Sequence, residues 1–571
     1  MVRATFAGFS TALSALQANQ KRLDITGQNL ANMNTVGYTR QQLETSSLNY
    51  TNPVSHYMSV PTVNVGFGVR MDRVSQIRDP YLDAQYRAQM SKASYTGSIQ
   101  TALDSLANVL DESNISGIRQ AFANIQSTLT NMHDTPNVID PVYESELRSR
   151  MQALTNLLND ASKQITEAEK NEFDRLNGDG TSESGAEQRV NDILRQIGDL
   201  NVQIKQNQIV GQPALELLDN RNSLLDELAG YLPIEVSYFK DANHTGQYNY
   251  TYTDAQGTTH TEVRDKMYEY DSNGKVIGKK EWPDDLKVEM VYKDDAGATQ
   301  RLTLVNGTEG GQGNNYGKIE IQGTRTAPTN TSVAVYSSAG STAADVTITA
   351  NTANASTPGY GSLADGSIQA GLDMLESTGT TGGVNNVRGY EYYMNRLNTL
   401  ASSFAEVMNT LNINGREGAI LADKTGNNGA ITAANIGIST GWVNGTVHIG
   451  TKGDSQSDTV TNMLEAMTKT YPDSGIFTGI NLENKSFADY TNNLSTILAN
   501  DSLANQTAMK TNVTVLNGIQ DSRDSISGIS LDEEAANMMT YVSAYNAASR
   551  LMTALDEVLN TLINNTGLVG R

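Results

Sequence analysis

The chain has 571 residues and not one cysteine. This absence excludes disulfide bonds, thiolate metal sites and a cysteine nucleophile. Histidine is also scarce, and none of the five histidines stands in the His-x-x-x-His or His-Glu-x-x-His spacing of a helical zinc site. Phosphate-binding Gly-x-x-x-x-Gly-Lys-Ser/Thr loops and Gly-x-Ser-x-Gly nucleophile elbows are missing as well. We therefore expect a protein that is not an enzyme, with no catalytic residues, cofactor or metal.

Basic residues are in deficit, with 41 Lys and Arg against 63 Asp and Glu and a net charge of −22. Such a chain is a poor partner for nucleic acid and for anionic membranes, which both need a basic surface. No run approaches the roughly 18 apolar residues of a membrane span. The N-terminus also lacks the apolar stretch and cleavage site of a secretory signal. If the protein leaves the cell, we expect it to do so without a cleaved signal peptide.

The first 32 residues have the heptad pattern of a helix that packs against another helix. The turn signal from Asn32 to Gly37 predicts where this helix ends. We expect the N-terminal seam to contain Phe9, Leu13, Leu16, Leu23 and Leu30.

The C-terminal region mirrors this pattern. Ser530 and Glu533 have the spacing of a capping box, which predicts the start of a helix. Apolar residues then recur every three or four positions, as in a coiled coil. The simplest packing pairs the two terminal helices with each other. The predicted C-terminal seam consists of Leu531, Met538, Tyr541, Tyr545, Met552, Leu555, Leu559 and Leu562.

Further helices are expected between the two ends. Proline at the first helical position predicts helix starts at Asp79-Pro80 and Asp140-Pro141. Residues 190–204, 365–412 and 486–520 also have helical periodicity, with a Gly/Thr-rich interruption at 377–383.

Two blocks break the helical pattern. Residues 236–364 are rich in Tyr, Thr, Val and Gly, and the runs 286–292 and 301–305 have the alternation of a β-hairpin. Residues 413–485 are shorter and mixed. We predict a multidomain α+β protein with an elongated helical coiled-coil or bundle body formed by the N- and C-terminal segments, and with inserted mainly-β domains. The predicted units are terminal coiled-coil helices (1–60 with 525–571), a helical body (61–235, 365–412 and 486–524), a mainly-β insertion (236–364) and a mixed insertion (413–485).

Two motifs at the chain ends resemble a known family. The segment from Asn29 to Gln41, Asn-Leu-Ala-Asn-Met-Asn-Thr-Val-Gly-Tyr-Thr-Arg-Gln, resembles the N-terminal signature of bacterial flagellar rod, hook and hook-associated proteins. Ser527 to Glu534, Ser-Gly-Ile-Ser-Leu-Asp-Glu-Glu, is similar to their C-terminal signature. Gly37 is expected to have a positive φ in the turn. The motif residues are Asn29, Asn32, Asn34, Gly37, Tyr38 and Arg40.

Interior segments narrow the resemblance to the family of the first flagellar hook-associated protein (FlgK), one of these axial proteins. They are residues 79–87, 190–236, 371–412 and 485–490. The resemblance implies a structural subunit at the hook–filament junction outside the cell, delivered by flagellar type III export. The implied partners are further copies of the chain in a ring or tube, the hook protein, the third hook-associated protein (FlgL), and an export chaperone at the C-terminal helix.

Two alternatives stay open at this stage. The chain could be another axial protein, such as a hook or distal-rod subunit, although the segment from Leu218 to Leu228 and the long helical body argue against this. It could also be an adhesin whose inserted domains bind a ligand, which a glycan-binding screen of the insertion would test.

Overall fold

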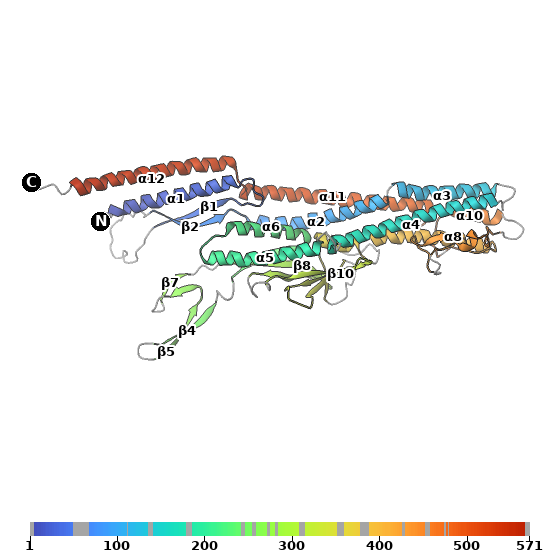
Figure 1. Ribbon diagram of the computed structural model, residues 1–571, viewed down its shortest axis with the longest axis horizontal. Coiled ribbons are helices and arrows are strands. Elements are labelled where there is room, and N and C mark those ends of the chain that lie inside the picture. The colour runs from blue at the N-terminus through green and yellow to red at the C-terminus, as the bar shows by residue number, and fades with distance from the viewer. Residues whose placement is uncertain are drawn as a thin grey trace, which may run out of the picture.

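The computed structural model of the chain is an elongated rod, with long helices along one axis and both termini at the same end (Figure 1). The helical body with an inserted mainly-β region confirms the predicted multidomain α+β class. The structure describes residues 5–48, 68–110, 112–134, 141–178, 185–240, 246–253, 258–270, 275–279, 284–307, 315–350, 359–376, 387–424, 429–450, 457–472, 476–477 and 479–565.

The two terminal helices, α1 (Thr5–Ala31) and α12 (Leu531–Asn565), pack against each other, as the sequence predicted. Beside α1, strands β1 (Gln41–Ser47) and β2 (Val69–Gln76) form an antiparallel pair. This strand pair was not predicted. Strand β1 belongs to the predicted terminal unit (1–60) and β2 to the predicted helical body (61–235), so the pair connects the two units. Residues 41–47 are therefore a strand and not part of a terminal coiled coil, since after the turn the sequence no longer has a helical period.

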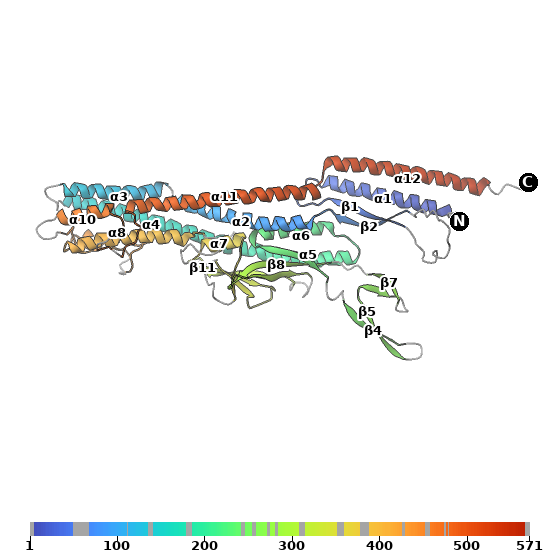
Figure 2. The same ribbon diagram turned by 180° about the vertical axis from the view of Figure 1, so that it is seen from behind.

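Long helices make up the body, and Figure 2 shows α11 running from the body's far end to the terminal pair. N-cap residues fix where two of these helices begin. Asp79 and Ser486 accept hydrogen bonds from backbone amides in the first turns of α2 and α11. The helices are α2 (Pro80–Val109), α3 (Glu112–His133), α4 (Pro141–Asn177), α5 (Ala186–Ile209), α6 (Leu215–Tyr231), α7 (Ser367–Met374), α8 (Tyr390–Asn414) and α11 (Phe487–Ser527). The helix predicted over 365–412 is thus two helices, and residues 377–383 between them lie outside the described residues.

Aromatic side chains hold the far end of the body together. Phe122 on α3 contacts Phe404 on α8 edge-on, with ring centroids 5.5 Å apart. Phe487 at the start of α11 contacts both rings at 5.8 and 5.6 Å. All three rings are fully buried. Three segments far apart in the sequence therefore share one hydrophobic core.

The first insertion contains a seven-stranded sheet that packs against α5 and α4. Its hairpin of β8 and β9 was predicted from the sequence, and its turn is held by Asp294, which accepts hydrogen bonds from the amides of Ala296 and Ala298. The strands are β3 (Ile234–Phe239), β8 (Asp285–Asp294), β9 (Thr299–Asn306), β10 (Lys318–Thr324), β11 (Ala327–Tyr336), β12 (Val346–Ile348) and β13 (Tyr360–Ser362). Only the short β12–β13 pairing is parallel among these described strands.

Two smaller hairpins project from this insertion: β4 (Gln247–Thr253) with β5 (Thr259–Asp265), and β6 (Tyr268–Tyr270) with β7 (Val276–Lys279).

The region of the predicted second insertion contains short strands and helices, and it is anchored on α4. The buried Trp442 donates its indole N–H to Glu144 Oε1 at 2.8 Å, and Arg148 donates to the Trp442 carbonyl at 2.7 Å. Its elements are β14 (Leu421–Asp423), β15 (Ile436–Ile438), α9 (Thr440–Val443) and α10 (Ser457–Thr468).

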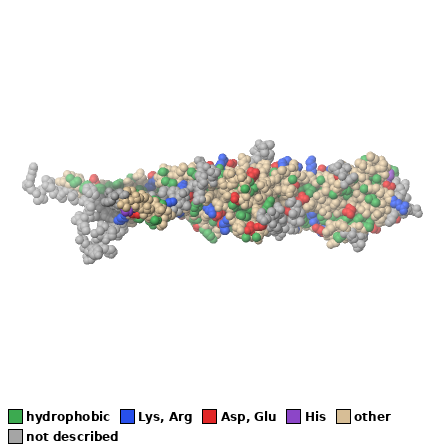
Figure 3. Space-filling model, turned by 90° about the horizontal axis from the view of Figure 1, so that it is seen from below, with side chains coloured by type: hydrophobic (Ala, Val, Ile, Leu, Met, Phe, Trp, Pro, Cys, Tyr) green, Lys and Arg blue, Asp and Glu red, His purple; other side chains and the backbone are tan. Residues whose placement is uncertain are grey.

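The surface is mixed in character. In Figure 3, acidic, basic and hydrophobic side chains are interspersed along the body. Of the helices that the structure describes, none has the length and apolar character that crossing a bilayer requires.

Candidate functional site

The two signature motifs, at opposite ends of the sequence, meet in one place. The end of α1, the start of β1, the turn between α11 and α12, and α6 converge where the terminal pair joins the body (Figure 1). We call this region the joint and define it by the residues described below. It is the candidate functional site because it fixes the terminal helices on the body.

Asn29 is the centre of the joint and is 1% exposed. Its Oδ1 accepts hydrogen bonds from the Gln41 amide at 3.0 Å and from the Tyr38 hydroxyl at 3.1 Å. Its Nδ2 donates to the Gln41 carbonyl at 3.0 Å and to Glu534 Oε2 at 3.4 Å. One side chain therefore ties together the end of α1, the first residue of β1 and the first turn of α12. An amide suits this position because it donates and accepts at once.

Arg40 and Glu534 form the second connection. Arg40 Nε donates to Glu534 Oε1 at 2.8 Å, and Arg40 Nη1 donates to Glu533 Oε2 at 2.8 Å. The Arg40 amide also donates to the carbonyl of Ser527 at 3.0 Å. Glu534 is 2% exposed, so its charge is compensated by Arg40 and Asn29 and not by water. Both glutamates lie in the first turn of α12, where negative charge is favourable.

Thr39 connects the joint to α6. Its hydroxyl donates to Asp219 Oδ1 at 2.6 Å, and its amide donates to Asp219 Oδ2 at 3.2 Å. Burial raises the pKa of Asp219, and the bonds from Thr39 and the nearby Arg78 charge oppose this only in part. Burial, together with the charges of Asp219, Glu216 and Glu534, raises the pKa of Tyr38 to about 12. The Tyr38 hydroxyl therefore stays protonated and can donate to Asn29.

Arg523, near the end of α11, clamps α11 to two body helices. It donates to Asp83 of α2 at 2.9 Å and to Asp226 of α6 at 2.8 Å, and it stacks over the Tyr86 ring at 4.3 Å. Arg87 of α2 donates to the other oxygen of Asp226 at 2.8 Å.

Electrostatics keep these groups charged. Burial alone would raise the pKa of Asp83, but the hydrogen bonds and charge of Arg78, with Arg523 and Arg87 nearby, leave it below its ordinary value. Burial opposes the charge of Arg523, yet Asp226 and Asp83 outweigh this effect and raise its pKa. Asp83 and Arg523 are therefore an oppositely charged pair at neutral pH.

Beyond the joint, α1 and α12 run antiparallel as far as Leu555. Asn29 bonds Glu534, the Arg22 guanidinium lies 5.6 Å from the Tyr541 ring centroid, and a methyl group placed on Gly8 would lie 3.2 Å from Leu555 Cδ2. The small residues of α1 allow this close approach. Ala12 and Ala18 on α1 and Ala548 on α12 are buried in the seam.

The predicted seam residues divide into two groups. Most are partly buried, but Leu13, Leu531 and Tyr545 are 49%, 54% and 37% exposed, so the helix pair leaves much of their surface in water. The side chain of Leu562 lies outside the described residues. The partly buried group is Phe9, Leu16, Leu23, Leu30, Met538, Tyr541, Met552, Leu555 and Leu559.

The motif residues also divide. Asn29, Tyr38 and Arg40 form the joint, whereas Asn32, Asn34 and Gly37 belong to the turn that follows α1. Gly37 has a φ of +80°, as expected for a glycine in this turn. Asn32 bonds the Gln28 carbonyl at 3.0 Å and so helps to end α1.

The sequence did not identify the acidic partners in the joint, nor Arg523. Glu534, Asp219 and Asp226 all lie inside segments that resembled the axial family, but nothing in their spacing connects them to Asn29, Thr39 or Arg523. The Asn29–Glu534 pair is separated by 505 positions.

The arrangement of hydrogen bonds and ion pairs holds α1, β1, α6, α11 and α12 together. Within the described ranges, no group of three or more His, Asp or Glu side chains could hold a metal ion. A buried, mutually satisfied polar network specifies one geometry, because every alternative leaves buried groups without partners.

Comparisons with known proteins agree with this geometry. Three family models match in order along the chain: the flagella basal body rod protein at residues 9–39, the helical domain of flagellar hook-associated protein FlgK at 103–263, and the C-terminal region of flagellar basal body rod FlgEFG proteins at 520–565. The first and last matches coincide with α1 and α12.

Relatives extend the similarity to the whole chain. Flagellar hook-associated protein 1 of Bacillus subtilis is 28% identical over 582 residues, which cover 99% of each chain. The proteins of the same name from Salmonella typhimurium and Escherichia coli are 28% and 26% identical over 43% and 44% of this chain, and 42% and 43% of their own. The structure of the flagellar hook junction protein FlgK from Burkholderia pseudomallei matches with 19% identity and a TM-score of 0.37 over 61% of this chain and 46% of its own. The ordered family matches and the end-to-end relative show that the chain is similar over its whole length to flagellar hook-associated protein 1.

Proposed function

We propose that this protein is a structural subunit of the hook–filament junction, an adaptor that joins two polymers through its terminal helices. The observation that carries the proposal is the end-to-end similarity to flagellar hook-associated protein 1, together with the meeting of both axial signatures in one joint. Because the family is that of a flagellar hook-associated protein, we place the chain in the external flagellum. We infer that it reaches this place without a cleaved signal peptide, by flagellar type III export.

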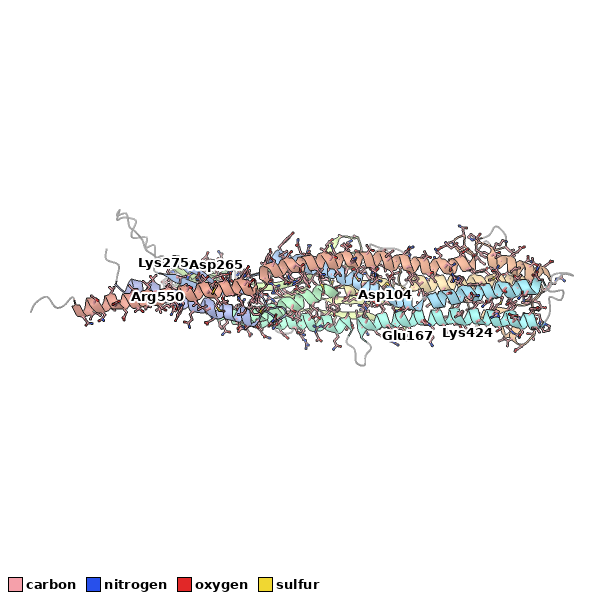
Figure 4. The ribbon with its side chains drawn as sticks, turned by 90° about the horizontal axis from the view of Figure 1, so that it is seen from above. Asp104, Glu167, Asp265, Lys275, Lys424 and Arg550 are labelled. Atoms are coloured by element: carbon pink, nitrogen blue, oxygen red, sulfur yellow. The ribbon has the colours of Figure 1, made fainter. Side chains whose placement is uncertain are left out.

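The terminal pair supports the assembly role. Besides the seam that faces α1, α12 exposes large apolar side chains to water. An apolar surface of this kind on a monomer marks a place where another protein binds. Figure 4 places Arg550 of α12 at the end of the rod that carries the termini, away from the body. The exposed residues are Leu531, Met539, Val542, Tyr545, Leu551, Val558 and Ile563, at 37% to 69% exposure.

We propose that these apolar side chains contact neighbouring copies in a ring or tube, the hook protein on one side and the third hook-associated protein (FlgL) on the other. Before assembly, an export chaperone would cover the same helix. The binding free energy then comes from burying apolar helix surface, and no covalent bond is made or broken. In this proposal the protein is not an enzyme.

Deletion of the gene tests the proposal. Electron microscopy of the mutant cells should show hooks without filaments, and flagellin should accumulate in the medium. Intact filaments would contradict the junction role. Absent hooks would indicate a rod or hook subunit instead.

A further inference from the structure

The hairpin of β4 and β5 has an edge that nothing described covers. Among the described residues, β4 pairs with β5 alone. Every residue of β4 is exposed. The hairpin projects away from the helical body, on the side opposite α12 (Figures 1 and 2).

The sequence of β4 does nothing to prevent pairing with another strand. Its seven residues, Gln-Tyr-Asn-Tyr-Thr-Tyr-Thr, include no charged residue and no proline. The register with β5 is continuous from Gln247 to Thr253, without a bulge. Proteins usually protect a free edge with charge, proline or a bulge, and an uncharged segment rich in β-formers is the type that adds to other strands.

The same insertion shows what a protected edge looks like. Strand β10 ends the large sheet, but α5 supplies its missing partners. Asn191 accepts from the Ile319 amide at 2.8 Å and donates to the Ile319 carbonyl at 2.9 Å, and Glu187 accepts from the Ile321 amide at 2.8 Å. One edge is thus closed by side chains of the same chain, whereas β5 is the only described strand that pairs with β4.

The open strand is also held in a fixed shape. Tyr248, Tyr250 and Tyr252 alternate along β4 and so share one face of the hairpin. On this face the Arg264 guanidinium lies 3.7 Å from the Tyr250 ring centroid and 5.0 Å from that of Tyr270, which belongs to β6. The Tyr270 hydroxyl in turn accepts from the Asp265 amide at 2.9 Å. An isolated two-stranded hairpin is marginally stable, and these contacts hold the edge ready for a partner.

From these observations we propose that the outer edge of β4 pairs with an extended segment of a neighbouring copy of this chain. The choice of a second copy rests on the proposed function, in which copies pack around an axis through their terminal helices. Figure 1 shows the hairpin at the same level along the rod as α1 and α12. Copies that pack through these helices would therefore bring their hairpins to the same level. The chain carries a net charge of −22, so a contact between copies is favoured at a segment that has no charge.

The absence of cysteine makes a direct test possible. Asn249→Cys gives the full-length chain a single thiol on β4, to which a maleimide–benzophenone photocrosslinker is attached. Hook-junction particles are isolated from cells that express a mixture of light and ¹⁵N-labelled chains. We expect crosslinked peptides that join a light copy to a heavy copy, identified by mass spectrometry.

A charge variant and its matched control show whether the edge itself is responsible. Gln247→Lys with Thr251→Lys adds two positive charges along β4 and should lower the yield of mixed-isotope crosslinks at least about fivefold. Thr259→Lys with Thr261→Lys adds the same charge to β5 and should leave the yield within about twofold. An equal loss in both variants would overturn the proposal, as would crosslinks that join β4 only to another protein or only within one copy.

Mass spectrometry first establishes whether the isolated particles contain the chain. This result tests the junction role separately from the pairing of β4. If the chain is absent, the junction role fails, and the inference about β4 is decided by the same crosslinking on the concentrated purified chain. Mixed-isotope crosslinks there support edge pairing, and their absence overturns it.

Discussion

The body and the terminal pair are both built from long helices, but they differ in how much they bury. In the body, Leu106, Leu154 and Phe404 are completely inaccessible to water. In the terminal pair Ala12 and Ala18 are buried to a similar degree, but the larger apolar residues are less completely buried, and Ile25 is 7% exposed. The body buries enough apolar surface to be stable by itself, whereas the terminal pair is held by a single helix–helix seam and its outer face is exposed to solvent. The comparison suggests that the body is complete as a monomer and that the pair is completed by neighbours.

A charge in the seam should break the terminal pair and spare the body, which is the largest expected effect. In Leu555→Asp, a carboxylate replaces a side chain packed at Gly8, and burying it is costly. We expect no incorporation into flagella, measured by immunoblotting of purified hook–filament particles. Far-UV circular dichroism should still show a cooperative transition for the body at an unchanged temperature. Normal filaments in this mutant would contradict the assembly role of the seam.

The second prediction compares the loss of stability caused by a Phe→Ala substitution in the body with that caused by the same substitution in the terminal pair. Phe404→Ala removes a fully buried ring that contacts Phe122 and Phe487, and should lower the free energy of unfolding by about 3–5 kcal/mol. Phe9→Ala, in the half-buried terminal seam, should cost less than about 1 kcal/mol. Urea unfolding of both variants measures the difference. Equal losses would show that the pair is as strongly packed as the body.

The joint should show an intermediate and local effect. Asn29→Ala leaves the buried amide and carbonyl of Gln41 without their side-chain partner, at a cost of about 1–3 kcal/mol. Hydrogen exchange of the Gln41 amide should accelerate, while amides in the core of α4 keep their protection. Asn32→Ala is the matched control, since the Asn32 side chain makes exposed hydrogen bonds with Gln28 at the end of α1 and with Thr35 in the turn. Unchanged exchange at Gln41 in Asn29→Ala would argue against the joint.

The smallest expected effect is a pH dependence of the body's free energy of unfolding, caused by Glu169. Glu169 on α4 is 7% exposed, and its Oε1 has no hydrogen-bond partner among the described residues. Burial, and then the charge of Glu391, raises its pKa from 4.5 to about 7. The folded state therefore binds more protons than the unfolded state between these values, so the free energy of unfolding falls as pH rises through this window.

The variant Glu169→Gln should lose this part of the pH dependence. We expect it to be more stable than the native chain at pH 8 by about 1 kcal/mol, since solvent screens part of the shift. Near pH 4 the two chains should be equally stable. Urea unfolding at both pH values measures the effect, and a difference that does not change with pH would contradict this account.

Local signals in the sequence predicted many elements correctly. Asp79-Pro80 and the Ser530–Glu533 pair marked helix starts, and Gly37 marked a turn with positive φ. The alternation at 286–305 gave the β8–β9 hairpin. These features depend on neighbouring residues only, so the periodicity of the sequence is enough to predict them. The β1–β2 pair has no such signal, because its register is set against α1 and not by a tight turn.

The sequence by itself determined that the chain begins and ends with helices made to face other helices, and that no local motif for catalysis is present. Only the tertiary structure decided how those helices are fixed to the body. Asn29 meets Glu534, Thr39 meets Asp219, and Arg523 meets Asp83 and Asp226, and the two residues of each pair are 180 or more positions apart in the sequence. It also decided that side chains of α5 close the β10 edge, whereas β4 has β5 as its only described partner strand. Contacts of this kind depend on the folded path of the whole chain, and spacing along the sequence carries no record of them.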